Sequence, residues 1–239
     1  MSTLAVFDMA GTTIDDGGAV YRALEQAVAE TGVAVAPEDL QTWMGAEKRA
    51  AITALIELGG GDPRSPEGKV DAAFERFLAI LDELYTQAPP TPIGGAEQAF
   101  ADLRAAGLQI ALTTGFSRDV ADGILAGLGW VVSGTEAAAL APDGAVVLDA
   151  VVCGDEVAQG RPAPYMIHRA MELTGTLDVA DLVIAGDTVV DVQAGANAGA
   201  GVTIGVLTGK LDRDAFAGQP YTALLDSVAA IPAFLAARA

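Results

Sequence analysis

"LAVFDMAGTTIDDGG", residues 4–18, is the stretch that decides the fold. Its apolar run at 4–7 has the length of a buried strand and stops at Asp8, where a Gly-Thr-Thr turn at 11–13 follows. A carboxylate in that position has two uses. It caps the next helix, or it attacks phosphorus while backbone N–H groups of the turn hold phosphate oxygens. This stretch alone leaves both open.

Three more short apolar runs end in polar or glycine-rich turns, and helix-like periods separate them. The runs are residues 109–112, 182–185 and 202–206, and the helical periods include 94–107 and 161–175. Strands that alternate with helices predict a doubly wound α/β core, with a parallel sheet covered on both faces. In such sheets, ligands bind at the carboxyl ends of the strands. The polar residues that follow the apolar runs lie at those ends.

Residues 17–91 differ from the rest because their apolar positions recur at helical spacing. Helices are expected over 46–59 and 70–87, and the first of them ends at a triple glycine. An all-helical segment inserted after the first strand predicts a cap domain that closes over the sheet on hinges. We therefore expect a core domain of residues 1–16 and 92–239 and a helical cap domain of residues 17–91.

Composition narrows the class of protein. Apolar residues make up 51% of the 239 residues, enough for a large core. With 13 basic and 32 acidic residues, the formal net charge of −19 argues against nucleic-acid or anionic-membrane partners. No apolar run is long enough to span a membrane, the N-terminus lacks the basic region of a signal peptide, and Cys153 is the only cysteine. We expect a soluble cytoplasmic protein that acts on small molecules, with Cys153 a buried apolar residue rather than a reactive thiol.

A second group of carboxylates lies in "LVIAGDTVVDVQAGANAGAGVTIGV", residues 182–206. Asp187 follows a predicted strand and Asp191 comes four residues later, so both face one side of the following helical turn. Together with Asp8 they suit Mg²⁺, a hard cation that prefers oxygen ligands. The alternative is that Asp187 caps a helix and Asp191 is solvated.

Four motifs occur in order along the chain. They are "DMAGTT" at 8–13, "LTTG" at 112–115, "GRPAPYM" at 160–166 and "GDTVVD" at 186–191. With a helical insertion after the first, they resemble the haloacid dehalogenase-like hydrolases over nearly the whole chain. The resemblance implies that Asp8 is a nucleophile that forms an aspartyl-phosphate.

The same resemblance implies roles for residues of the other motifs. Thr114 would bond a phosphoryl oxygen, and Arg161 would balance charge between nucleophile and phosphate. Mg²⁺ would be held by Asp8, Asp187 and the backbone carbonyl of Ala10, with Asp191 supporting nearby. Further substrate contacts are expected from Gly11, Thr12, Met44, Gly115 and Phe116.

Ala10 is informative because the ordinary phosphatases of the superfamily have an aspartate there, which protonates the leaving group. Alanine transfers no proton, which removes a contribution of roughly 10²–10⁴-fold. The "DxAGTT" form resembles the phosphonatase branch, the phosphonoacetaldehyde hydrolases, in which a cap lysine forms an imine with the substrate aldehyde. Their "MGxxK" segment is matched by Met44, Gly45 and Lys48 in "WMGAEKRAAITAL", residues 43–55.

Helix periodicity supports Lys48 independently of the resemblance. Ile52 and Leu55 follow at i+4 and i+7, so Lys48 shares their apolar stripe, whereas Arg49 points elsewhere. Burial on such a stripe favours the neutral amine that imine formation requires. The alternative is a lysine that extends from the edge of the stripe into solvent.

The match to the phosphonatases has gaps near the chemistry. Their histidine three residues after the lysine is Ala51 here, their tyrosine after "TTG" is Phe116, and their cysteine after the first motif is Gly18. His168, the only histidine, is expected to be structural. "APDGAVVLDAVVC", residues 141–153, resembles a hairpin excursion.

The leading hypothesis is a Mg²⁺-dependent phosphonatase-like hydrolase. It would cleave the C–P bond of phosphonoacetaldehyde or a related carbonyl phosphonate. Lys48 would condense with the carbonyl, Asp8 would take the phosphoryl group, and closure of the cap would bring the two together. The alternatives are a phosphate-monoester phosphatase of the same superfamily and a non-catalytic phosphate sensor or scaffold. The resemblance also implies a homodimer formed through the cap.

Overall fold

The computed structural model describes residues 3–43 and 46–238 of the chain. The chain divides into two compact units. One comprises Met1–Asp15 with Thr91–Ala239, and the other is Asp16–Pro90. These divisions lie one residue from the predicted domain boundaries, and each unit is described below by itself.

The first unit is built on a six-stranded parallel sheet with the strand order β10-β9-β8-β1-β4-β7. Its strands are β1 (Leu4–Asp8), β4 (Gln109–Thr114), β7 (Ala150–Cys153), β8 (Leu182–Gly186), β9 (Val202–Val206) and β10 (Ala223–Leu225). The α/β class is thereby confirmed, and the four strands expected from apolar runs end within two residues of their predicted positions.

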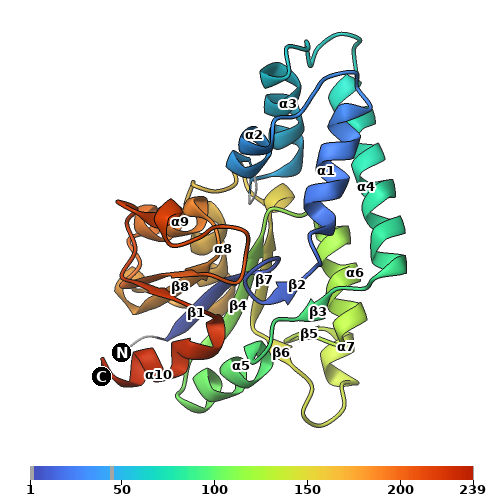
Figure 1. Ribbon diagram of the computed structural model, residues 1–239. Coiled ribbons are helices and arrows are strands. Elements are labelled where there is room, and N and C mark those ends of the chain that lie inside the picture. The colour runs from blue at the N-terminus through green and yellow to red at the C-terminus, as the bar shows by residue number, and fades with distance from the viewer. Residues whose placement is uncertain (1–2, 44–45, 239) are drawn as a thin grey trace. The chain divides into compact units, whose positions relative to one another are not determined.

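Helices cover both faces of this sheet (Figure 1). They are α5 (Ala96–Ala105), α6 (Arg118–Leu128), α8 (Tyr165–Thr174), α9 (Val189–Ala198) and α10 (Ile231–Ala236). The short helix α7 (Glu136–Ala139) packs instead on β5 (Val131–Val132). Short 3₁₀ turns lie at Gly154–Glu156, Val179–Asp181, Asp214–Phe216 and Val228–Ala230. α8 packs on β7, β4 and β1, and α9 packs on β8 and β9. α5 packs on β4, and α10 packs on α5.

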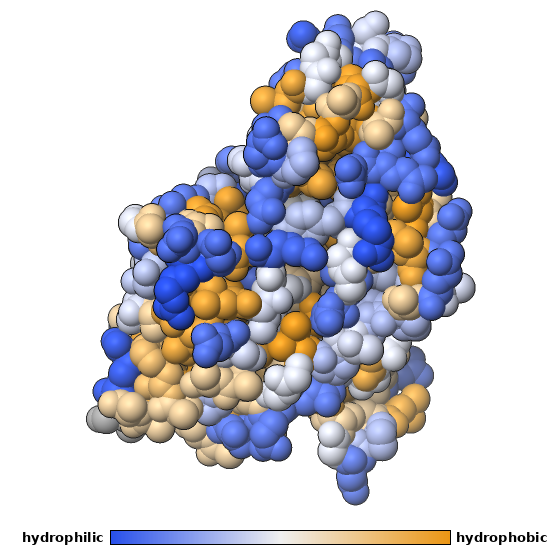
Figure 2. Space-filling view, viewed as in Figure 1, coloured by the Kyte–Doolittle hydropathy of each residue, from blue (hydrophilic) through white to orange (hydrophobic). Residues whose placement is uncertain are grey.

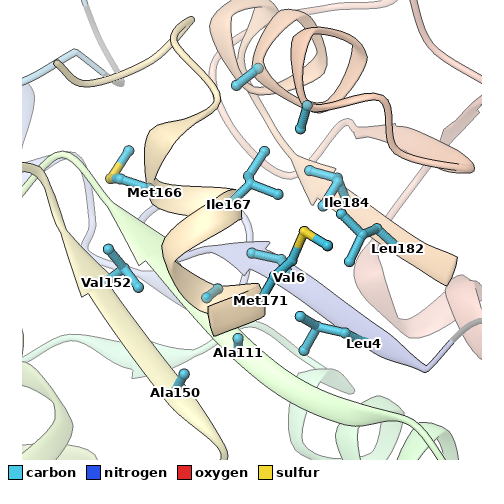
Figure 3. Close-up of a cluster of buried hydrophobic side chains, with 13 residues drawn as sticks. Leu4, Val6, Ala111, Ala150, Val152, Met166, Ile167, Met171, Leu182 and Ile184 are labelled. Atoms are coloured by element: carbon cyan, nitrogen blue, oxygen red, sulfur yellow. The ribbon is translucent and has the colours of Figure 1, made fainter. Parts of the chain in front are cut away.

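Under α8 and α9 lies a cluster of buried apolar side chains. Ile167 and Met171 of α8 point toward Val6 of β1 (Figure 3). Because successive strand residues face opposite sides, Phe7 lies on the other face, with its ring centroid 5.3 Å from that of Phe100 in α5. Burial on both faces explains why β1 is apolar along its length instead of alternating with polar residues.

The prediction of a hairpin at 141–153 is wrong. Val147–Leu148 (β6) pairs in parallel with Val131–Val132 (β5), and β7 pairs in parallel with β4. Asp149 separates β6 from β7, since its N–H donates to Ile110 O and its carboxylate accepts from the N–H of Ile110, both at 2.7 Å. The second apolar run therefore extends the main sheet beside β4, where it is buried, rather than folding back on the first run.

The second unit is a helical bundle. Its helices are α1 (Ala19–Ala29), α2 (Pro37–Thr42), α3 (Lys48–Leu58) and α4 (Lys69–Gln87). α1 packs along α4, and α3 packs against both. The apolar faces of α1 and α4 are buried, with Leu24 and Phe77 at most 1% exposed. The helices predicted over 46–59 and 70–87 are confirmed within two residues at each end.

A short two-stranded ribbon marks where the chain leaves the first unit and returns to it. β2 (Ile14–Asp15) pairs antiparallel with β3 (Thr91–Pro92). Next to this pair, the N–H of Ile93 donates to Thr13 O at 2.9 Å. The outgoing and returning segments are therefore hydrogen-bonded to each other within the first unit.

Hydrophilic residues occupy much of the visible surface, with apolar patches between them (Figure 2). This agrees with a chain that has 32 acidic and 13 basic residues. Over the described ranges, no helix combines the length and the apolarity needed to cross a membrane.

Candidate active site

Asp8 ends β1 and is 7% exposed. β1 lies between β4 and β8, so the ends of three strands meet beside this carboxylate. Thr114 ends β4, and Gly186 ends β8 with Asp187 directly after it. Because these strands are buried along their length, their first polar side chains gather at one edge of the sheet, as the strand ends in the sequence indicate.

The turn after β1 is closed by its own backbone. The N–H of Gly11 donates to Ile14 O at 2.8 Å. The N–H groups of Thr12 and Thr13 donate to Met9 O at 3.2 and 2.9 Å. Gly11 has φ +85°, a left-handed conformation that favours glycine. The sequence predicts that N–H groups of this turn hold phosphate oxygens. These three N–H groups donate to carbonyl groups of the turn instead.

The two threonine hydroxyl groups of the turn donate hydrogen bonds within the site. Thr12 is fully buried, and its hydroxyl donates to Asp187 Oδ1 at 2.9 Å. Thr13 Oγ1 donates to Asp8 O at 2.9 Å. Thr12 therefore orients Asp187, and its contact with substrate stays a prediction. Ala10 is half-buried and offers only a methyl group, while its carbonyl as a metal ligand also stays a prediction.

Three acids and one arginine form the centre of the site. One carboxylate oxygen each of Asp8, Asp187 and Asp191 lies within 4.8 Å of the others, and all three residues are buried. Arg161 bridges two of these acids, with Nη2 donating to Asp8 Oδ1 at 2.7 Å and Nη1 donating to Asp191 Oδ1. The second oxygen of Asp191 accepts from the N–H of Thr188 at 3.0 Å and from its hydroxyl. The alternative of a solvated Asp191 is therefore wrong, because Asp191 is 3% exposed and held on both oxygens.

Burial controls the electrostatics of this cluster. Burial raises the pKa of Asp8 from 3.8 to about 6, against the attraction of Arg161 and with added repulsion from Asp191. Burial, then Asp8 and Asp191, raise the pKa of Asp187. Although burial disfavours the charged guanidinium, Asp191 and Asp8 raise the pKa of Arg161, which stays cationic. The three carboxylate groups therefore bring more negative charge to the site than the single guanidinium of Arg161 balances.

This donor set fits Mg²⁺. The ion prefers carboxylate and carbonyl oxygens and keeps several waters, and three buried carboxylates with one guanidinium leave an excess of negative charge. Both oxygens of Asp191 already accept hydrogen bonds, which suits a supporting position. Asp8 and Asp187 are then the carboxylates that would ligate the ion.

The segment after β4 lies next to Asp8 across the sheet. Thr114 is 3% exposed, and its hydroxyl accepts from the N–H of Phe116 at 3.2 Å. Phe116 is likewise 3% exposed, and its carbonyl accepts from the N–H of Gly154 at 3.0 Å. Gly115, between them, is buried. The structure brings this segment to the strand end where a phosphoryl group is expected, since Thr113 pairs with Asp8.

Lys48 belongs to the helical unit, and its side chain is buried. It is the first residue of α3 and is 4% exposed, and its Nζ donates to Ala46 O at 3.0 Å. Ile52 and Leu55 of the same stripe are at most 1% exposed. The alternative of a lysine that reaches solvent is therefore wrong. Arg49 points elsewhere, as expected, and pairs with Asp71.

The remaining predicted residues are placed as follows. Met44 lies outside the described residues. Ala51 is fully buried in α3, and Gly18 precedes α1 with φ +75°. His168 is exposed on α8, where its Nε2 lies 3.3 Å from Ala198 O, in agreement with a structural role. Cys153 is fully buried, and burial raises the pKa of its thiol to about 12, so the prediction of an unreactive thiol is supported.

Sequence reasoning missed three residues that contact the acids or the turn after β1. Thr188 forms a capping box with Asp191 at the start of α9, which the T-x-x-D spacing could have indicated. Thr208 donates its hydroxyl to Gly11 O at 2.6 Å, and Gly209 lies against Asp187. No local pattern marks Thr208 and Gly209, because their partners are far away in the sequence.

A family model described as haloacid dehalogenase-like hydrolase matches residues 3–199, and the chain belongs to that family of hydrolases. Within it, the chain is similar to phosphonoacetaldehyde hydrolase from Bacillus cereus (strain AH187). The two are 33% identical over 222 residues, which covers 85% of this chain and 75% of the relative. The predicted enzyme class and the resemblance to phosphonoacetaldehyde hydrolases are thereby confirmed.

Solved structures share the fold. A hydrolase from Pseudomonas syringae matches with a TM-score of 0.81 and 18% identity, covering 100% of both chains. A phosphonoacetaldehyde hydrolase like protein from Oleispira antarctica matches with a TM-score of 0.74 and 21% identity, covering 99% of this chain and 92% of that one. At these identities the likeness concerns the fold alone.

Proposed function

We propose that this protein is a Mg²⁺-dependent phosphonatase. It would cleave the C–P bond of phosphonoacetaldehyde, or of a closely related carbonyl phosphonate, through a lysine imine and an aspartyl-phosphate. The similarity to phosphonoacetaldehyde hydrolase from Bacillus cereus supports this substrate class. The phosphoryl half of the chemistry is assigned to Asp8 and its neighbours, and the carbonyl half to Lys48.

The observation that carries the proposal is the burial of Lys48 in a chain that has Ala10 after its nucleophile. A lysine that is only 4% exposed is unusual, because burying an ammonium group is costly. Desolvation favours the neutral amine, which is the nucleophile that attacks an aldehyde. Ala10 cannot protonate a leaving group, and a leaving group activated as an imine needs no proton at that step.

The proposed reaction forms covalent intermediates on two residues, Lys48 and Asp8. The Nζ lone pair of Lys48 adds to the aldehyde carbon, the carbonyl oxygen takes one proton from Nζ and one from solvent and leaves as water, and a protonated imine forms. A carboxylate oxygen of Asp8 attacks phosphorus, the P–C bond breaks, and its electron pair becomes the C=C bond of an enamine while the imine nitrogen loses its positive charge. Water hydrolyses the aspartyl-phosphate to phosphate. The enamine takes a proton on carbon, and a second water releases acetaldehyde and Lys48.

Residues around Asp8 suit the phosphoryl transfer. Arg161 holds one oxygen of Asp8 and orients it, and its Nε is buried without a hydrogen-bond partner among the described residues. A buried donor in that state is expected to bind an oxygen of the substrate. Thr114, the last residue of β4, would donate its hydroxyl to a second oxygen. Mg²⁺ held by Asp8, Asp187 and Ala10 O would supply positive charge to the phosphoryl oxygens.

The helical unit is proposed to act as the cap, with residues 17–91 moving against a core of residues 1–16 and 92–239. Exclusion of bulk water would protect the imine and the aspartyl-phosphate. We further propose a cytoplasmic enzyme that forms a homodimer through the cap. Its partners would be small phosphonates or phosphates rather than nucleic acid or membrane, because the net charge of −19 repels polyanions.

The second candidate is a phosphate-monoester phosphatase. The observation that favours it is the buried cluster of Asp8, Asp187 and Arg161, because these groups would handle a phosphoryl group whatever its leaving group is. Such an enzyme needs a proton source other than Ala10, since a poor alkoxide leaving group requires a general acid.

The deciding experiment is Mg²⁺-dependent phosphate release from phosphonoacetaldehyde and from a panel of phosphate monoesters. Lys48→Arg is expected to abolish C–P cleavage at unchanged thermal stability, and borohydride with substrate should trap a two-carbon adduct on Lys48 of the wild type. Lys69→Arg is the matched control, because Lys69 is the first residue of another helix in the same unit. Full phosphonate cleavage by Lys48→Arg would overturn the imine, and release from monoesters only would establish the second candidate.

A further inference from the structure

The loop after β9, residues 207–209, lies outside all four sequence motifs and outside the residues that the family model matches. It nevertheless contacts two of the motifs. The N–H of Leu207 donates to Leu225 O at 3.1 Å, which fixes the start of the loop to the end of β10. From this anchored position the next two residues reach the turn after β1 and the segment after β8.

Thr208 holds the turn that follows Asp8. Its hydroxyl donates to Gly11 O at 2.6 Å, across 197 positions of sequence. Gly11 is the residue of that turn with φ +85°, and its neighbour Thr12 donates to Asp187 Oδ1 at 2.9 Å. The Thr208 hydroxyl thus fixes the peptide from which Thr12 reaches Asp187.

Gly209 lies directly against the Asp187 side chain. A methyl group added at Gly209 would lie 2.6 Å from Cγ of Asp187 and 2.8 Å from its Cβ, closer than carbon atoms approach without displacement. Gly11 contacts the same carboxylate, since a methyl group there would lie 2.7 Å from Asp187 Cγ. Glycine backbones from two loops therefore restrict the Asp187 carboxylate. The backbone of Gly209 is not in the left-handed region, so alanine is excluded by space and not by conformation.

We propose that Thr208 and Gly209 are positioning residues of the active site, which fix the Asp187 carboxylate in the orientation that binds Mg²⁺. The inference rests on the proposed function, because it assumes that Asp187 ligates the ion. Mg²⁺ demands near-ideal octahedral geometry with short bonds to oxygen, so a carboxylate free to rotate binds it more weakly. Partners that orient ligands typically contribute about 10–100-fold to metal affinity.

The test measures the Mg²⁺ dissociation constant by calorimetry, without substrate, for the full chain and its variants. Thr208→Val, which keeps the shape and loses the hydroxyl, and Gly209→Ala are both expected to raise the dissociation constant by about 10–100-fold. Thr208→Ser should restore wild-type affinity. Phosphate release by Thr208→Val should recover at high Mg²⁺ concentration, which a purely structural defect would not allow.

Two matched controls accompany these variants. Thr174→Val removes a hydroxyl that donates to Ala170 O at 2.8 Å in α8, away from the acids. Gly127→Ala adds a methyl group in open space on α6. Both should bind Mg²⁺ as the wild type does.

Each outcome bears on a different claim. Wild-type Mg²⁺ affinity in both Thr208→Val and Gly209→Ala would overturn the positioning role and leave the proposed function standing. Failure of the wild type to bind Mg²⁺ would overturn the metal-dependent function and the positioning role with it. If Gly209→Ala does not fold, Thr208→Val and its serine rescue still decide.

Discussion

The buried charge of Asp8 is predicted to lower the stability of the metal-free protein above about pH 6, and Asp8→Asn should remove this cost. The pKa of Asp8 is raised from 3.8 to about 6 in the folded chain, mainly by burial. An acid with a raised folded pKa holds its proton more tightly when folded, so the free energy of unfolding falls as pH rises through this interval. The interval corresponds to about 3 kcal/mol once both states are ionised.

The assay is urea unfolding in the presence of EDTA at pH 5 and pH 8. Asp8→Asn should be more stable than the wild type by about 3 kcal/mol at pH 8 and by roughly half of that at pH 5. Asp143→Asn makes the same charge change at an exposed loop position and should show no such difference. Millimolar Mg²⁺ at pH 8 should stabilise the wild type and not Asp8→Asn.

Two results would refute this reasoning. Asp8→Asn could prove no more stable than the wild type at pH 8, in which case the buried charge carries no cost. A gain of equal size at pH 5 and pH 8 would mean that the effect comes from packing and not from ionisation.

Three further predictions test other parts of the molecule. Arg161→Lys loses the fork that bridges Asp8 and Asp191, so phosphate release should fall by about 10²–10³-fold with an unchanged circular dichroism spectrum. The Cys153 thiol, buried and with its pKa raised to about 12, should not react with Ellman's reagent at pH 8 in the native protein but should react fully in urea. Phe77→Ala removes a ring that is 1% exposed in α4 and should lower the free energy of unfolding by about 3–5 kcal/mol, measured by urea denaturation.

The fold was predictable where a strand is buried on both faces and ends in a polar residue. β1 satisfies this condition, because its apolar run stops at Asp8. β10 does not, since Ala223–Leu225 has three half-buried residues that no period distinguishes from a helix turn. β7 was misassigned because its partner is β4, about forty residues away along the chain.

The site was predictable to the extent that its residues follow strand ends. Asp8, Asp187 and Asp191 carry that signal, and the structure brings them together. The contacts of Thr208 and Gly209 depend on how β9 and its loop pack on the rest of the sheet, which is a tertiary property. The direction of the Thr12 hydroxyl is also a tertiary property, because its acceptor, Asp187, lies 175 positions later in the sequence.

The pairing of β2 with β3 has a consequence for how such a protein can diversify. Because the outgoing and returning segments are hydrogen-bonded to each other, an insertion between them leaves the sheet and the Asp8 turn in place whatever its length. Recombination at this ribbon can therefore exchange the whole inserted bundle as a module. Under the proposed function, such an exchange would bring in a new carbonyl-binding bundle with its lysine and leave the residues around Asp8 unchanged.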